Sequence, residues 1–214
     1  MRKTQYVIVF LTVLFGVGGT IFQLGQSDRP LESISYFTTL SNAFAGLVFA
    51  IIFVDLWRHK TVHVRLISLS HIAAVSLMVT FLVYHFALRP TLNAFEAFNV
   101  GGPLDISLHY ITPLLTMGAY FLMPLHQDKV LLASLKPIVF PLAYLSYVII
   151  YVTAGGRFTL DDVEYRQPYF FLDLERFGFF GVLGNIIGLA MVFALLAWIT
   201  FMMKRQLKRN EDLA

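Results

Sequence analysis

Six long apolar stretches follow one another along the chain, and each is bounded by polar or turn-forming residues. A stretch of about 20 apolar residues is long enough to cross the hydrocarbon core of a bilayer as an α-helix. The pattern therefore predicts an all-α, polytopic membrane protein with six transmembrane helices and one domain covering residues 1–214. The predicted helices cover about 5–25, 36–57, 66–86, 103–125, 132–153 and 177–203.

The starts of the first and fourth predicted helices depend on individual residues. Met1-Arg2-Lys3 precedes the first apolar stretch, as the basic region of a secretory signal would. The stretch is longer than a signal core and no small-residue cleavage pattern follows it, so we expect an uncleaved first helix. Pro103 stands where the fourth helix begins. Proline is favoured at the first helical position because its missing N–H has no partner there.

The distribution of basic residues predicts the orientation. Eleven of the 16 Lys and Arg residues lie in the N-terminus, in 58–65, in 126–136 and in the tail from Lys204 onward. The alternate loops hold the other five. Because loops rich in Lys and Arg stay on the cytoplasmic side, we expect both termini to be cytoplasmic.

Composition supports a membrane protein and excludes several classes. Hydrophobic residues make up 57% of the chain and charged residues 14%, against roughly 25% charged in an ordinary soluble domain. The net charge of +3 does not indicate a nucleic acid partner, because the basic residues flank the apolar stretches. The chain has no cysteine, and its six histidines show no compact metal-binding spacing. We expect no disulfide, no metal and no cofactor.

Four polar side chains stand at the head of the second predicted helix: Thr38, Thr39, Ser41 and Asn42. Polar groups at membrane depth cost free energy unless they find partners, so this cluster marks either a helix contact or a site. A helix contact is the better interpretation for Thr39 and Ser41. Asn42 could stabilise an oxyanion near Thr38, or it could join two helices.

The fourth predicted helix carries a second polar group. Asp105, His109 and Thr112 share one helical face. A histidine held by a carboxylate and facing a hydroxyl from another helix has the parts of a base, an orienting group and a nucleophile. The alternative is a hydrogen bond between helices, with Asp105 placed favourably at the positive end of its own helix.

Further polar residues are expected at the same depth. His85 closes the third predicted helix, Tyr151 lies near the outer end of the fifth, and Asn185 lies two turns below the outer end of the sixth. We expect these side chains to gather just below the outer interface. Small residues predict close helix packing at Gly178, Gly181, Gly184 and Gly188 in the sixth helix and at Ala43, Gly46 and Ala50 in the second.

Three motifs resemble those of the androgen-induced proteins and their bacterial relatives, a family of six-helix membrane proteins. They are Tyr36-Phe37-Thr38, then His109 followed within a turn by Pro113, then Tyr169-Phe-Phe-Leu-Asp173. The bacterial branch is the nearer one, so the resemblance implies a bacterial cytoplasmic membrane.

The resemblance also implies an activity, because characterised animal members hydrolyse fatty-acid esters of hydroxy fatty acids. By position, Thr38 would be the nucleophile and His109 its base. Asp173 would then either hold His109 or pair with Arg157 or Arg176. The His109-to-Pro113 spacing is one residue shorter than in the animal proteins, and the motif's proline stands at Pro168.

Two functions are therefore expected. One is a membrane hydrolase that acts on a lipid-like ester near the outer leaflet, through Thr38 and His109. The alternative is a non-catalytic carrier or binding protein for a small lipophilic molecule. Membrane lipids are the expected surroundings in both cases, and the sequence does not indicate an oligomeric state.

Overall fold

The computed structural model describes residues 2–59, 61–92, 101–125, 129–160 and 163–212. These residues are mostly helical, and five helical segments are long and apolar enough to cross a membrane. The chain is thus a membrane-embedded helical protein. The five segments are Lys3–Gln26, Phe37–His59, Val64–Thr91, Val130–Thr153 and Leu174–Asn210.

The fourth predicted segment is helical but is not one of these five. It consists of α7 (Pro103–Ile106), the π-helical turn η3 (Ser107–Ile111) and α8 (Thr112–Leu122). The polar residues Asp105, Ser107 and His109 lie in its first half and lower its apolar character. The predicted boundary at Pro103 is confirmed, and the predicted last residues, Met123–Leu125, lie beyond the helix.

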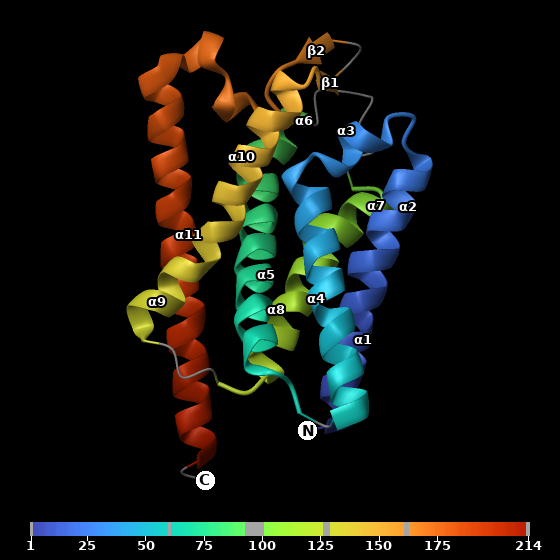
Figure 1. Ribbon diagram of the computed structural model, residues 1–214, viewed down its shortest axis with the longest axis vertical. Helices are drawn as coiled ribbons and strands as arrows, with labels where there is room; N and C mark the ends of the chain where they lie inside the picture. Colours follow the sequence, from blue (N-terminus) through green and yellow to red (C-terminus); the bar gives the residue numbers. More distant parts are fainter. Residues whose placement is uncertain (1, 60, 93–100, 126–128, 161–162, 213–214) are drawn as a thin grey trace.

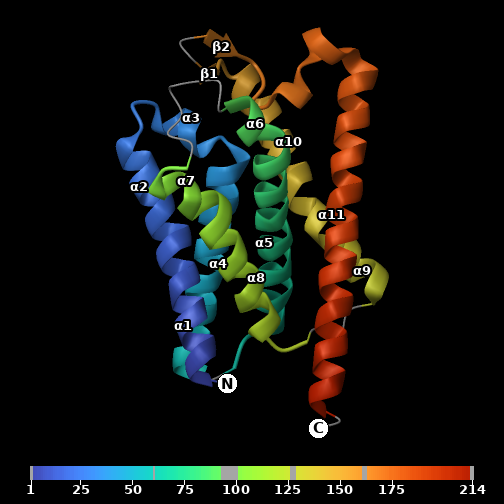
Figure 2. The same cartoon turned by 180° about the vertical axis from the view of Figure 1, so that it is seen from behind.

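Four helices form the centre of the molecule, and each packs on two neighbours in a closed ring. They are α1 (Arg2–Val13), α4 (Phe37–His59), α5 (Val64–Val83) and α8, as Figures 1 and 2 show from opposite sides. Val9, Phe49 and Ile52 are fully buried between them. The π-helical turn η1 (Leu14–Gly18) connects α1 to α2 (Gly19–Gln26). The π-helical turn η2 (Tyr84–Leu88) connects α5 to α6 (Arg89–Leu92).

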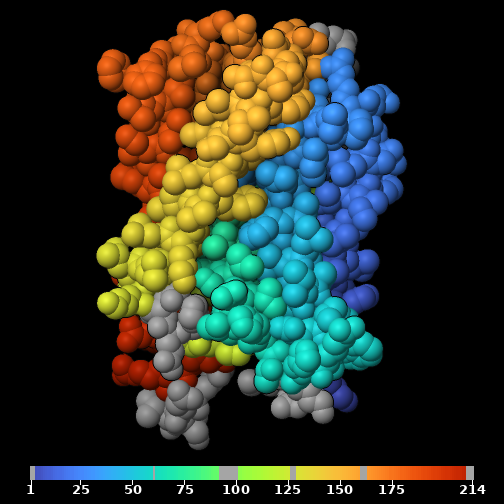
Figure 3. All heavy atoms as spheres, viewed as in Figure 1, coloured from blue at the N-terminus to red at the C-terminus, as the bar shows by residue number. Residues whose placement is uncertain are grey.

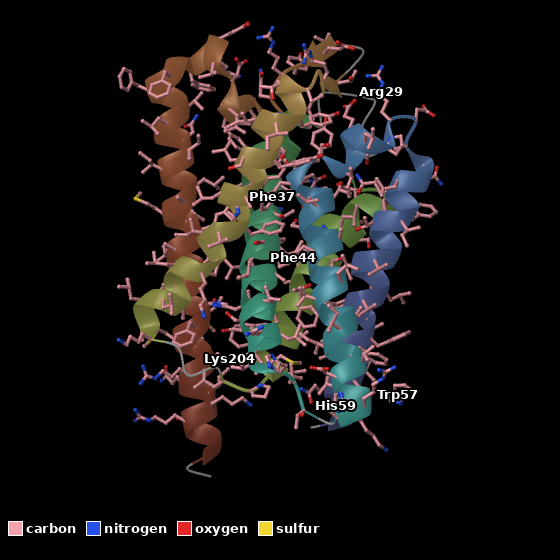
Figure 4. All side chains as sticks on the ribbon, viewed as in Figure 1. Arg29, Phe37, Phe44, Trp57, His59 and Lys204 are labelled. Carbon is pink, nitrogen blue, oxygen red and sulfur yellow. The ribbon has the colours of Figure 1, made fainter. Side chains whose placement is uncertain are left out.

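Two further helical segments flank this ring. The first consists of α9 (Val130–Leu135), η4 (Lys136–Ile138) and α10 (Val139–Thr153), and it crosses the face seen in Figure 3 diagonally. Phe140 of α10 packs against Phe37 and Phe44 of α4, which are both labelled in Figure 4. The second segment is α11 (Leu174–Asp212), which packs on α9, η4 and α5.

The predicted sixth helix differs from α11 at both ends. The helix begins at Leu174 and continues to Asp212, so Lys204 lies inside it and not in a tail. Gly178 interrupts its helical geometry with a φ of 64°, a left-handed conformation that glycine adopts without a steric penalty. The N- and C-termini lie at the same end of the molecule (Figure 1).

The opposite end carries α3 (Pro30–Ile34), η5 (Phe170–Leu172) and a small hairpin that the sequence did not predict. Strands β1 (Phe158–Leu160) and β2 (Val163–Tyr165) pair antiparallel. Glu32 of α3 accepts a 2.6 Å hydrogen bond from the Thr159 backbone N–H, which holds the hairpin against this end of the bundle, the hairpin end.

The outer surface of the helices is strongly apolar. Phe180 is 84% exposed, Trp57 71% and Phe179 67%. Soluble monomers rarely expose contiguous apolar patches of large size, so these side chains indicate contact with lipid.

Close glycine packing occurs between α4 and η1, not along α11. A Cβ atom on Gly46 would lie 2.7 Å from the Val17 backbone nitrogen, and one on Gly16 would lie 3.0 Å from the Gly46 Cα. The expectation for α11 is wrong at Gly184 and Gly188, where a Cβ atom would meet nothing within 4 Å.

We predict that Gly46→Ala destabilises the protein by about 2 kcal/mol, because the added methyl would push two backbones apart. Gly188→Ala is the matched control and should leave stability unchanged or slightly raised, since the site is open. Thermal unfolding of the purified variants in detergent measures both. Equal unfolding temperatures for Gly46→Ala and the wild type would contradict the close approach of α4 and η1.

Candidate functional site

One cavity lies between the central ring and the two flanking segments. It offers about 90 Å³ to the centres of water-sized molecules, and its walls come from α4, α5, α10 and α11. Most of the wall is apolar, with Ile138, Leu189 and Phe193 among the lining residues. The polar lining residues are Thr38, Thr80, Tyr144, Tyr169 and Asn185.

Tyr169 lies at the end of this cavity where α4 begins. Its phenol oxygen accepts a 2.9 Å hydrogen bond from the Phe37 backbone N–H, a group left free by the first turn of α4. The same oxygen lies close to the hydroxyl groups of Thr38 and Tyr144. Burial raises the pKa of Tyr169 to about 12, so the phenol is neutral at physiological pH and can both donate and accept.

Tyr36 and Tyr144 connect this end of the cavity to α3. Tyr144 donates a 3.1 Å hydrogen bond to the Ser35 carbonyl oxygen. Tyr36 packs edge to face on the rings of Tyr169 and Phe158. Burial and the nearby Glu32 carboxylate raise the pKa of Tyr36. These phenols fix the loop before α11 on the head of α4.

Asn185 lines the same cavity from the α11 side. Its side-chain amide donates a 2.8 Å hydrogen bond to the Phe171 carbonyl oxygen. No residue in the described part of the chain donates to its Oδ1 atom, which therefore remains available as an acceptor. Thr38, Tyr169 and Asn185 thus bring hydroxyl and amide groups from three separate segments to one apolar cavity.

His109 lies in a second polar cluster, on η3. Its Nδ1 atom is 2.8 Å from Asp105 Oδ1, so the predicted contact along one helical face is present. Asp105 Oδ2 accepts hydrogen bonds of 2.6 Å from the Tyr84 hydroxyl and 2.8 Å from the Gly101 N–H. The His109 ring stacks on Tyr84 with ring centres 3.7 Å apart. The imidazole is therefore oriented by a carboxylate and by an aromatic face.

Thr38 and His109 are not joined in the structure. His109 does not line the cavity that Thr38 lines, and no hydrogen bond connects the two side chains, both of which are described. Two consecutive residues where α5 meets η2 show the separation. Val83 lines the cavity, whereas the ring of Tyr84 stacks on the ring of His109.

The other polar residues of α4 join helices. The Asn42 amide donates to the Thr38 carbonyl oxygen at 2.8 Å and to the Leu108 carbonyl oxygen at 3.1 Å, so it links α4 to η3. Ser41 shares a 3.2 Å hydrogen bond with Thr80, and Thr39 donates to Gln23 at 3.2 Å. The structural interpretation of Thr39 and Ser41 agrees with these contacts.

The remaining sequence-predicted residues lie outside both clusters' centres. His85 contacts the Tyr110 hydroxyl at 3.1 Å on an exposed surface, and Tyr151 donates to the Arg157 carbonyl oxygen at 3.2 Å. Asp173 accepts from the backbone N–H groups of Glu175 and Arg176, so it caps α11. Its described contacts include neither an arginine side chain nor His109. No group of three potential metal ligands occurs among the described residues.

Sequence reasoning did not find Tyr84 or the central place of Tyr169. Tyr169 stood in the third resemblance motif, but nothing in that motif indicated that it would meet the head of α4. Tyr84 lies in an apolar stretch four residues after Thr80, and its hydroxyl acquires a partner only when α5 packs against η3.

We predict graded losses of stability when Asp105 and its partners are altered. Tyr84→Phe removes one hydrogen bond and should cost about 1 kcal/mol, whereas Asp105→Ala leaves three donors without their acceptor and should cost about 3 kcal/mol. Thr153→Ala is the control, because its hydroxyl bonds only to its own helix. The unfolding temperature should be highest for Thr153→Ala, lower for Tyr84→Phe and lowest for Asp105→Ala. An Asp105→Ala protein as stable as the wild type would contradict the geometry of the cluster.

Comparisons with protein-family models, with curated proteins and with solved structures found no match to this chain. The site therefore rests on its own geometry.

Proposed function

We propose that the protein binds or carries a small lipophilic molecule with one polar group inside the membrane. The observation that supports this best is the apolar cavity of about 90 Å³ with Thr38, Tyr169 and Asn185 among its lining residues. A ligand site of this kind is mostly apolar, with a few polar groups that orient the ligand. An acyl chain would lie against Ile138, Leu189 and Phe193, with its polar end near Thr38.

The ligand would enter from the bilayer between α10 and α11. Both helices contribute walls to the cavity, yet α11 packs on α9, η4 and α5 and not along α10. In Figure 1 the two helices diverge toward the end that carries the hairpin. A lipophilic molecule could thus reach Thr38 without leaving the membrane.

We expect Ala190→Trp to block binding, because Ala190 lines the cavity and an indole would fill it. Leu195→Trp is the matched control on the same helix, at a position 56% exposed to lipid. A photoactivatable long-chain acyl ester serves as the ligand, and its crosslinking to purified protein measures binding. The first variant should bind at least about tenfold more weakly, a loss of about 1.4 kcal/mol. Equal crosslinking of both variants would exclude this cavity.

Hydrolysis of a lipid ester is the second candidate, and one arrangement favours it. Thr38 lines the cavity, while the Asp105–His109 pair holds an imidazole oriented as a general base would be. His109 would have to reach the Thr38 hydroxyl in the ligand-bound state, take its proton during attack on the ester and return it to the leaving alcohol, through an acyl-threonine intermediate.

The same ester separates the two functions. Recovery of the intact ester from the protein supports binding or carriage. Covalent labelling by a fluorophosphonate, present in the wild type and absent in Thr38→Ala and His109→Ala, supports hydrolysis. Labelling that persists in Thr38→Ala excludes Thr38 as the nucleophile.

We also propose six membrane crossings with both termini in the cytoplasm, and the cytoplasmic membrane of a bacterium as the location. Two observations support the crossings: the termini lie at one end of the molecule, and α8 is one of the four helices of the central ring although its segment is not among the five long apolar ones.

The chain has no cysteine, so single cysteines can report this topology. Glu164→Cys in the hairpin should react with a membrane-impermeant maleimide added to intact cells, and His59→Cys at the end of α4 should react only after lysis. The reverse pattern would invert the orientation. Reaction of both before lysis would contradict an intact barrier between the two ends.

A further inference from the structure

Lys204 is a buried cation inside an apolar helix. Its side chain is 1% exposed, although the sequence placed it with the basic C-terminal tail. In Figure 4 it lies between α11 and the central ring. A lysine inside a membrane-spanning segment is costly unless a partner compensates its charge.

The described partners of Lys204 do not include a carboxylate. Its Nζ atom donates a 2.7 Å hydrogen bond to the Tyr120 carbonyl oxygen and lies 3.8 Å from the centre of the Tyr120 ring. The carbonyl oxygen and the ring face carry partial negative charge, but an ammonium group has three donors and a full positive charge. Within the described residues no salt bridge neutralises it.

A small cavity adjoins this ammonium group. Its lining includes Ser68, His71 and Lys136 as well as Lys204, and no acidic residue lines it. It offers about 10 Å³ to the centres of water-sized molecules, which is room for about one oxygen atom. Two lysines and a hydroxyl surround this space, beside a histidine whose Nε2 atom lies 3.0 Å from the Thr200 hydroxyl, and together they make a site for an anionic oxygen.

The location of the cavity indicates where that oxygen comes from. Lys204 lies toward the end of the molecule that carries the C-terminus (Figures 1 and 4), and Arg205, Lys208 and Arg209 follow it on α11. Basic residues at a membrane surface attract the phosphate groups of anionic lipids.

We infer that Lys204, Lys136, His71 and Ser68 form a phosphate site at this end of the bundle, into which one phosphate oxygen inserts beside the Lys204 ammonium. The phosphate belongs either to an anionic phospholipid or to free inorganic phosphate. This site is separate from the Thr38 cavity and does not depend on the proposed function.

The test compares ligands with and without a phosphate group. The full chain is purified in a maltoside detergent and phosphate-free buffer, and its unfolding temperature is measured with dioleoylphosphatidylglycerol, with dioleoylglycerol or with inorganic phosphate. The phospholipid should raise the wild-type value by about 4 °C more than dioleoylglycerol does, as expected for a ligand at roughly ten times its Kd. Lys204→Met should lose this increment, and Arg205→Met, an exposed neighbour with the same charge change, should keep it.

Each outcome either supports the phosphate site or overturns it. An increment with phospholipid alone assigns the site to lipid, and an equal increment with inorganic phosphate assigns it to the free ion. An increment that persists in Lys204→Met, or its absence from the wild type with both phosphates, overturns the site. If Lys204→Met does not fold, Lys136→Met is measured instead and must lose the increment for the site to stand.

Discussion

The contact between Gly16 and Gly46 is the constraint on which the rest of the bundle depends. Without side chains at these positions, the backbones of η1 and α4 approach within van der Waals distance. That approach places Asn42, one turn away on α4, where its amide reaches the Leu108 carbonyl oxygen. The central ring is therefore held by backbone proximity and by a buried amide. In an environment where lipid competes equally for apolar surface, such contacts provide the specificity that hydrophobic burial cannot.

The polar groups near the hairpin end of the bundle form two sets. One set faces α10 and α11 and includes Thr38, Tyr169 and Asn185. The other faces η3 and is centred on Asp105. Because Thr38 and His109 share neither a hydrogen bond nor a cavity, a nucleophile and a base from the two sets meet only if the bundle rearranges. Ligand binding, in contrast, requires only the first set.

The sequence predicted five of the helical segments well because each is a long apolar stretch, and length alone distinguishes such a stretch from other elements. The Asp105–His109 contact was also predictable, since the spacing of four residues places both on one face. Which element packs against a given helical face was not predictable. Periodicity shows that Thr38 and Asn42 lie on one side of α4, but only packing determines that Asn42 meets η3 while Thr38 meets Tyr169.

Lys204 illustrates the same limit at the other end of the chain. Counting charges placed it in a tail, because a lysine after an apolar stretch usually marks the end of a crossing. The structure shows that α11 continues and that its packing against α8 buries the side chain. Asp173 shows the same limit: it accepts from the backbone N–H groups two and three residues ahead, whereas the sequence offered arginine side chains and His109 as partners.

The three π-helical turns have a consequence for how the chain tolerates change. Each turn holds one residue more than the α-helix would, so the helix beyond it is rotated by about a quarter of a turn relative to the helix before it. Deleting a single residue from η3 would relax it to regular geometry and swing Asp105 away from Tyr84. Adding or removing one residue at these turns would thus rotate the part of the helix on the hairpin side of the turn. The part on the other side would stay in register.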